Sequence, residues 1–180
     1  MAQRFSREQF RHWADGRKGR YERVAGEPVA MSPERIGHAR VKSRIWAALD
    51  RAVRAANIQC EALPDGITIE VDDDTDYEPD AILNCGPPAP GEAVAATNPV
   101  VVIEVLSPGT QSIDLTDKLA DYFRVPSIQH CLVVRARRRE VIHHRRTGAH
   151  IVTRVINLGS IQLDRPGIAI DLAEIYPAPA

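Results

Sequence analysis

A run of seven residues, Val100 to Leu106, constrains the fold more than any other segment of this chain. The run reads VVVIEVL, and six of its seven residues are aliphatic. β-Branched residues favour strands, and a continuous apolar run is typical of a strand that is buried on both faces. Strands of this kind lie in the middle of sheets that are covered on both sides. The run therefore predicts a central sheet, with Ser107-Pro108-Gly109 ending this strand.

The rest of the pattern predicts helices and further strands around this central strand. A capping box at Ser6–Gln9 predicts a helix over 6–15, and apolar residues at helical spacing predict one over 38–56. An Asp114 cap predicts a third helix over 115–124. Strands are predicted at 21–24, 28–31, 60–63, 67–71, 77–83, 130–135, 140–145 and 151–156. A chain of 180 residues has the length of one domain. We therefore expect a single α/β or α+β domain over residues 1–180, with a mixed central sheet flanked by helices.

Composition excludes several classes of protein. The net charge is -1, so general attraction to nucleic acid or to an anionic membrane is not indicated. No apolar run approaches the roughly 18 residues of a membrane span, and the first residues lack the apolar core of a signal peptide. These features predict a cytoplasmic protein without a membrane partner. The three cysteines are widely spaced and form no CxxC pair, which argues against a disulfide framework or a thiolate zinc site.

Glu104 is a charged residue inside the apolar run. Strand alternation places it on the same face as Val102 and Leu106. A buried carboxylate costs several kcal/mol unless it is paired or binds a cation. One interpretation is a structural salt bridge or an exposed strand end. The other is a metal ligand or catalytic carboxylate at the end of a central strand, where α/β sheets usually bind ligands.

Asp80 is a second carboxylate in a strand-like context, within YEPDAIL at 77–83. An aspartate in such a place is equally typical of a turn or a cap. If the two strands are neighbours, Asp80 and Glu104 converge. Two carboxylates in one site repel, so one takes up a proton or both share a cation. Oxygen ligands select Mg²⁺ or Mn²⁺ rather than zinc.

Lys118 lies at the margin of the apolar stripe of the helix that follows the Glu104 strand. It could form an ordinary i,i+4 ion pair with Asp114, worth roughly 0.2–0.5 kcal/mol. Alternatively, its ammonium group extends toward the acidic site. There it could orient a water molecule and balance developing phosphate charge.

Histidines and arginines give weaker signals. None of the six histidines has HxxxH or HExxH spacing, so a zinc site is not favoured, and His38 is more typical of a helix surface than of a phosphate contact. A basic hairpin around Arg135, Arg137 and Arg139 could contact a nucleic-acid backbone. It could equally be solvated or pair with the acidic loop 72–76.

Three segments, in order, resemble the PD-(D/E)XK nuclease superfamily: Pro79-Asp80, IEVLSP at 103–108 and DLTDKLADYF at 114–123. The resemblance is strongest to its restriction endonuclease branch, called Uma-two. It extends upstream to YERVAGEPVAMSP at 21–33 and to His38, and downstream to VPSIQHCLVV and EVIHHRR, so it covers nearly the whole chain.

This resemblance implies a restriction-endonuclease-like fold and Mg²⁺- or Mn²⁺-dependent hydrolysis of phosphodiester bonds in DNA. Asp80 and Glu104 match the metal-binding acids, and Lys118 matches a helix lysine used by this branch. Glu22, in YERV, matches an acid of the first hairpin that completes the site. The backbone carbonyl of Val105 is a further expected metal ligand.

The chain departs from the superfamily motif at one position. The motif has a lysine two residues after the second acid, where this chain has Leu106. Activity therefore depends on Lys118. The alternative is a catalytically inactive module of the same fold that binds nucleic acid or a protein partner. By analogy with nucleases of this fold, a homodimer is also expected.

Overall fold

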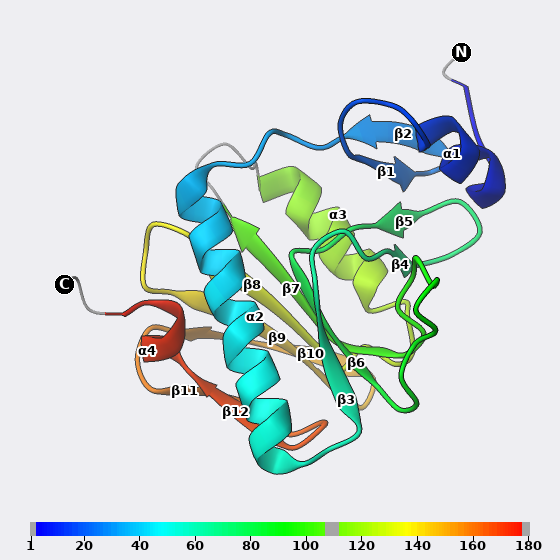
Figure 1. Ribbon diagram of the computed structural model, residues 1–180. Helices are drawn as coiled ribbons and strands as arrows, with labels where there is room; N and C mark the ends of the chain where they lie inside the picture. The colour runs from blue at the N-terminus through cyan, green and yellow to red at the C-terminus, as the bar shows by residue number, and fades with distance from the viewer. Residues whose placement is uncertain (1–2, 107–111, 178–180) are drawn as a thin grey trace.

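The computed structural model describes residues 3–106 and 112–177, and a six-stranded mixed sheet forms its centre (Figure 1). The order across this sheet is β10-β9-β8-β7-β6-β3. β7 and β8 run parallel, and the other neighbours are antiparallel. The strands are β3 (Cys60–Pro64), β6 (Ala81–Cys85), β7 (Pro99–Leu106), β8 (His130–Arg135), β9 (Val141–Thr147) and β10 (His150–Ile156). The predicted central strand is therefore confirmed as β7, third in from one edge.

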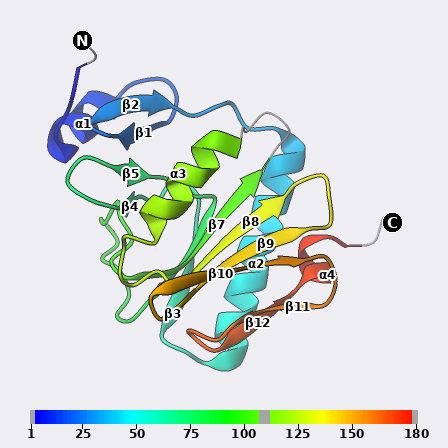
Figure 2. The same ribbon diagram turned by 180° about the vertical axis from the view of Figure 1, so that it is seen from behind.

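Helices cover the two faces of this sheet, as the opposite views in Figures 1 and 2 show. α2 (Ile36–Ala56) packs on one face, beside the hairpin β11 (Ser160–Leu163) and β12 (Ile168–Asp171) and the short α4 (Leu172–Ile175). α3 (Ser112–Tyr122) packs on the other face. Strand alternation divides β7 between two cores, with Val101 and Ile103 on the α2 side and Val102 on the α3 side. Glu104, two residues after Val102, shares the α3 side.

A smaller sheet of order β2-β1-β5-β4 lies beside the α3 face. Its strands are β1 (Tyr21–Val24), β2 (Glu27–Ala30), β4 (Ile69–Glu70) and β5 (Asp76–Tyr77). α1 (Arg7–Ala14) precedes it, and the predicted capping box joins Ser6 and Gln9 as expected. Because β1 belongs to this sheet, the small sheet carries Glu22.

Two differences from the predicted boundaries bear on the site. The segment 77–83 is not one strand, because β5 ends at Tyr77 in the small sheet and β6 begins at Ala81 in the large one. Pro79 lies in the crossover, where its missing N–H breaks no ladder bond. α3 begins at Ser112, so Asp114 is inside the helix rather than its cap. The Asp114 side chain and the predicted stop at 107–109 lie outside the described residues.

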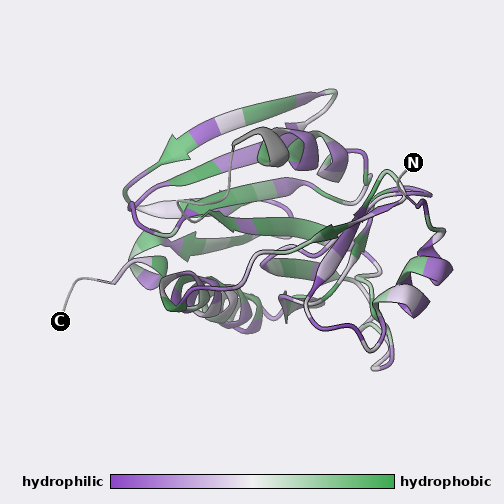
Figure 3. Cartoon of the chain, turned by 90° about the horizontal axis from the view of Figure 1, so that it is seen from above, coloured by the Kyte–Doolittle hydropathy of each residue, from purple (hydrophilic) through white to green (hydrophobic). Residues whose placement is uncertain are grey.

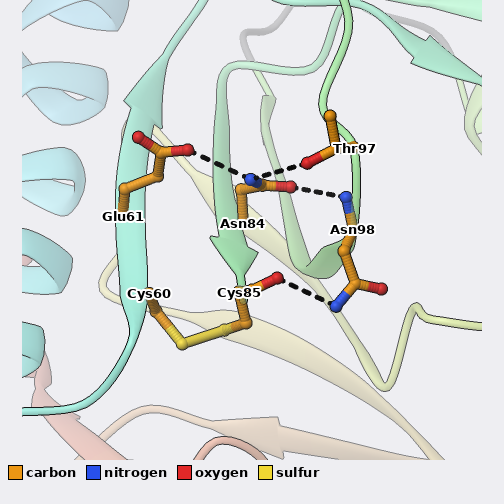
Figure 4. The surroundings of a disulfide bond; sticks show 6 residues. All are labelled: Cys60, Glu61, Asn84, Cys85, Thr97 and Asn98. Carbon is orange, nitrogen blue, oxygen red and sulfur yellow. Dashed lines mark hydrogen bonds between the residues drawn. A yellow bond between two sulfur atoms is a disulfide. The ribbon is translucent and has the colours of Figure 1, made fainter. Parts of the chain in front are cut away.

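The expectation about cysteines was wrong, because Cys60 and Cys85 form a disulfide (Figure 4). The antiparallel pairing of β3 with β6 places these residues directly opposite each other. Their separation of 25 residues along the chain gives no hint of this contact. Next to the bond, the Asn84 side chain donates to Glu61 and Thr97, which fixes the start of β7 against β6. Disulfides persist mainly in oxidising compartments, so the bond is unusual for the expected cytoplasmic location.

His130 on β8 and His143 on β9 form a buried pair. His130 Nδ1 lies 2.9 Å from His143 Nε2, so one ring donates and the other accepts. Burial is the main cause that lowers the pKa of each histidine to about 4. A second proton would leave two imidazolium groups facing each other in the core.

We therefore expect this histidine pair to destabilise the protein in mild acid, against the opposite contribution of any group whose pKa the fold raises. The folded pKa values lie below the ordinary value, so the unfolded chain takes up protons first as the pH falls below about 6.5. The contribution of the pair to the free energy of unfolding is complete above about pH 6.5. It declines toward pH 4, by up to roughly 3 kcal/mol per histidine. Urea unfolding at pH 7 and pH 4.5 measures this loss. His143→Gln should flatten the pH dependence, whereas His12→Gln, at an exposed position, should leave it unchanged. An equally steep profile in His143→Gln would contradict the assignment.

Candidate functional site

Asp80 lies beside the end of β7 that carries Glu104, where the chain crosses from the small sheet into β6. The Asp80 N–H donates to the Ile103 carbonyl over 2.9 Å. In return, the Val105 N–H donates to Asp80 Oδ2 over 2.6 Å. The Asp80 carboxylate therefore replaces a backbone acceptor at the end of the β6–β7 ladder. This is the capping role that the sequence left open for an aspartate here, and it places the carboxylate next to the residues that flank Glu104.

Lys42, on α2, is the cation nearest to Asp80 in the described structure, and it was not among the predicted site residues. Its Nζ lies 3.2 Å from Asp80 Oδ1 and 2.7 Å from both Asp65 Oδ2 and Glu34 Oε1. Only 7% of this lysine is exposed. Burial acts to lower the pKa of Lys42, but the hydrogen bonds to Asp65 and Glu34 and the Asp80 charge raise it overall.

His38, one helical turn before Lys42, points into the same place. Its Nε2 lies 2.6 Å from the Val105 carbonyl oxygen and 3.6 Å from Asp80 Oδ2, and its Nδ1 lies 3.0 Å from Glu34 Oε1. Both ring nitrogens thus lie against oxygen atoms. His38 is therefore part of the site rather than a surface residue. The i,i+4 spacing of His38 and Lys42 predicts only that they share one face of the helix, and not what that face contacts.

Glu104 faces the opposite layer, beneath α3. The Tyr122 hydroxyl donates to Glu104 Oε1 over 2.6 Å, and Lys118 Nζ lies 3.7 Å from the same oxygen. Burial is the largest influence and raises the pKa of Glu104 to about 7. The charges of Asp80 and Glu22 act in the same direction, while Lys118 and the Tyr122 hydroxyl act against it. Because the charge of Asp80 raises the pKa of Glu104, the two predicted acids lie within electrostatic reach of each other.

Glu22 and Lys118 complete the cluster on the α3 side. Lys118 Nζ donates to Glu22 Oε1 over 2.7 Å, and the same oxygen accepts the Glu78 N–H over 3.0 Å. Both side chains are buried, with 6% of Glu22 and 9% of Lys118 exposed. The small sheet thus delivers Glu22, and α3 delivers Lys118, to the carboxylate of the central strand.

The predicted side chains therefore form two neighbouring sets. Glu22, Lys118 and Glu104 lie together beneath α3, and Asp80 lies with His38 and Lys42 on the α2 side, with its charge still acting on Glu104. Among the described residues, no group of three or more histidine, cysteine or acidic side chains is arranged to hold a metal. Asp80, Glu104 and the Val105 carbonyl are oxygen donors of the type that Mg²⁺ prefers in proteins. The two cavities described, of about 610 and 430 Å³, are lined by other residues.

The proposed link between the basic hairpin and the acidic loop is wrong. Arg135 pairs with Glu140, and Arg145 pairs with Asp164. The acidic loop instead binds three other arginines: Arg7, Arg23 and Arg124. Part of the hairpin's charge is thus neutralised locally, with Arg138 sharing Glu140 with Arg135.

Comparison with known proteins supports the same family. The model of the Uma2 family, described as "Putative restriction endonuclease", matches residues 7–173. An uncharacterized protein, slr1290, of Synechocystis sp. (strain ATCC 27184 / PCC 6803 / Kazusa) is 23% identical over 176 residues, covering 96% of this chain and 92% of that protein.

A solved structure shows the same fold. It is the crystal structure of a protein from Anabaena variabilis ATCC 29413, described as "a putative nuclease belonging to DUF820". The TM-score is 0.76 at 13% identity, and the match covers 96% of this chain and 97% of that one. The predicted fold class, a mixed central sheet flanked by helices, is confirmed. No helix in the described parts of the chain is long and apolar enough to cross a membrane.

Proposed function

This chain belongs to the Uma2 family of restriction-endonuclease relatives, and on that premise we propose that it is a Mg²⁺- or Mn²⁺-dependent endonuclease that hydrolyses phosphodiester bonds in DNA. One observation carries the proposal. Asp80, just before β6, and Glu104, on the neighbouring β7, lie at the same sheet end within electrostatic reach of each other, with the Lys118 ammonium 3.7 Å from Glu104. Two acids beside a lysine supply both a cation site and a positive group for phosphate charge.

In this proposal, Asp80, Glu104 and the Val105 carbonyl hold the cation. When bound, a divalent cation polarises a phosphoryl oxygen and lowers the pKa of a water molecule. Lys118 stabilises the negative charge that grows on the phosphate in the transition state. Glu22 holds the Lys118 ammonium in place through their 2.7 Å contact. His38 would have to yield the Val105 carbonyl when the cation enters, because its Nε2 contacts that oxygen.

The second candidate is a catalytically inactive module that binds nucleic acid or a protein partner. The specific observation in its favour is Leu106, which occupies the place of the motif's strand lysine. A further one is that the ammonium of Lys118 is already engaged by Glu22.

Two measurements separate these candidates. Purified protein is incubated with supercoiled plasmid in Mg²⁺, in Mn²⁺ and in EDTA, and Mn²⁺ binding is titrated by calorimetry without DNA. The endonuclease should cut the plasmid with either metal and stop in EDTA. Mn²⁺ binding without cleavage of supercoiled, linear or single-stranded DNA would favour the inactive module or another phosphoester substrate. No binding at millimolar Mn²⁺ would reject the proposed metal site.

A further inference from the structure

β10, the outer strand of the large sheet, is the most prominent feature that the proposed site does not use. Figure 3 shows it as the outermost strand, mostly hydrophobic, along the top of the view. Its side chains from His150 to Val155 are all exposed. Ile151 and Val152 are 40% exposed, and Val155 is 62% exposed. Among the described strands, only β9 pairs with it.

The backbone of β10 offers unpaired hydrogen-bonding groups along this edge. The Arg146 N–H donates to the Gln129 carbonyl over 2.8 Å, on the β8 side. Arg146 is the partner of Ile151 in the β9–β10 register. Because Arg146 directs its N–H and C=O groups toward β8, Ile151 directs its own N–H and C=O groups away from β9. Because the direction alternates along an antiparallel pair, Ile151, Thr153 and Val155 direct their N–H and C=O groups outward.

β10 also lacks the features that usually protect an edge strand. Within its seven residues there is no proline or glycine, and its register with β9 is continuous, without a bulge. Arg154 is its single residue with a permanent charge. Natural proteins commonly block such edges with lysines, proline, bulges or a covering segment. An apolar edge that is left open is therefore a pairing surface.

We propose that β10 pairs antiparallel with β10 of a second copy of this chain, about a two-fold axis at Thr153. In this register the outward-facing residues meet as hydrogen-bonded pairs. Ile151 faces Val155 of the second copy, Val155 faces its Ile151, and the two Thr153 residues face each other. Two aliphatic pairs then flank the threonine pair in one row beside the α3 face, and aliphatic and threonine pairs favour antiparallel pairing.

The opposite face of β10 also fits this register. Arg154 of each copy faces Val152 of the other, so no residue lies directly opposite one of like charge. A two-fold arrangement of this kind is closed and uses the same surface twice. Leu158, 78% exposed and just beyond β10, comes opposite the Gly148 turn of the second copy. One strand pair is a small interface, so we expect a dissociation constant on the order of micromolar.

The pairing also has a consequence that rests on the proposed function. β7 is parallel to β8, and β8 and β10 are each antiparallel to β9, so β10 and β7 run in the same direction. An antiparallel β10 pair therefore directs the two β7 strands in opposite directions. The two candidate sites would lie at opposite ends of the joined sheet. Such a dimer would nick separate places rather than cut both strands of one duplex site.

Site-specific cross-linking tests the register. Thr153→Cys places two thiols across the axis, whereas Ile151→Cys places its two thiols roughly 13 Å apart along the strands. With a short bismaleimide, Thr153→Cys should give covalent dimers, while Ile151→Cys and the wild type, whose free Cys131 is buried, should not. Equal cross-linking of both variants would overturn the register.

Sedimentation velocity over a range up to about 100 µM tests the dimer itself. The wild type should pass from monomer to dimer, and Val155→Lys should remain monomeric because two lysines would enter the apolar row. Val94→Lys, at an exposed valine outside β10, should dimerise as the wild type does. Circular dichroism and thermal melting confirm that each variant is folded. Thr153→Pro, which removes an outward N–H, is a second disrupting variant. A wild type that stays monomeric, or dimers that persist in both disrupting variants, would refute the proposal.

Discussion

Replacing Asp80 with asparagine is expected to lower the rate of DNA cleavage by about 10³-fold, because a bound cation contributes several kcal/mol and each 1.4 kcal/mol is a factor of ten. Asparagine retains an oxygen that can accept the Val105 N–H, so the end of the β6–β7 ladder should survive. What the variant loses is the charge that attracts the cation. Plasmid cleavage and Mn²⁺ calorimetry should therefore fail together, while the melting temperature changes little.

A matched control separates loss of the site from loss of a surface charge. Asp50 is an aspartate on α2 whose partner is Arg54, one turn along the same helix. Asp50→Asn should cleave DNA at the wild-type rate. Asp80→Ala differs from Asp80→Asn because it also leaves the Val105 N–H without its acceptor, at a cost of about 1–3 kcal/mol of stability. Wild-type cleavage by a folded Asp80→Asn would end the assignment of Asp80.

The sequence indicated the centre of the fold because one signal there is strong. Six aliphatic residues in seven predict a strand buried on both faces, and β7 is that strand. It failed at 77–83, where a continuous strand pattern conceals a change of sheet. Local propensity carries no information about which sheet a strand joins, since pairing is decided by distant partners. The same limit explains Cys60 and Cys85, whose contact depends on the β3–β6 register.

The candidate site also contains residues that the sequence predicted and residues that it did not. Asp80 and Glu104 stand out because a charge within an apolar strand needs a reason. Lys42 and His38 do not stand out, because a lysine and a histidine on an amphipathic helix look like ordinary surface residues. They matter here only because α2 is aligned so that this pair faces the Asp80 carboxylate and the Val105 carbonyl. That alignment is a property of packing between layers, which spacing along one helix does not specify.

The two buried lysines raise the question of which one assists the reaction, and substitution by methionine distinguishes them. Lys118→Met retains the packed stem and removes the ammonium beside Glu104. We expect about a 10²-fold fall in kcat, comparable to the loss of one charge-stabilising group. Mn²⁺ affinity should change only slightly, since Lys118 is not a ligand. Lys42→Met should instead act mainly on cation binding and stability, because Lys42 neutralises Asp80 together with Asp65 and Glu34.

Measuring kcat and Mn²⁺ affinity in both variants therefore assigns the two roles separately. Melting curves are needed beside them, since each substitution leaves a buried carboxylate without its cation, Glu22 in one case and Asp80 in the other. A fall in kcat confined to Lys42→Met would move the catalytic role from α3 to α2. The α3 helix would then serve only to hold Glu22, and the absence of a lysine at Leu106 would be compensated from the opposite face of the sheet.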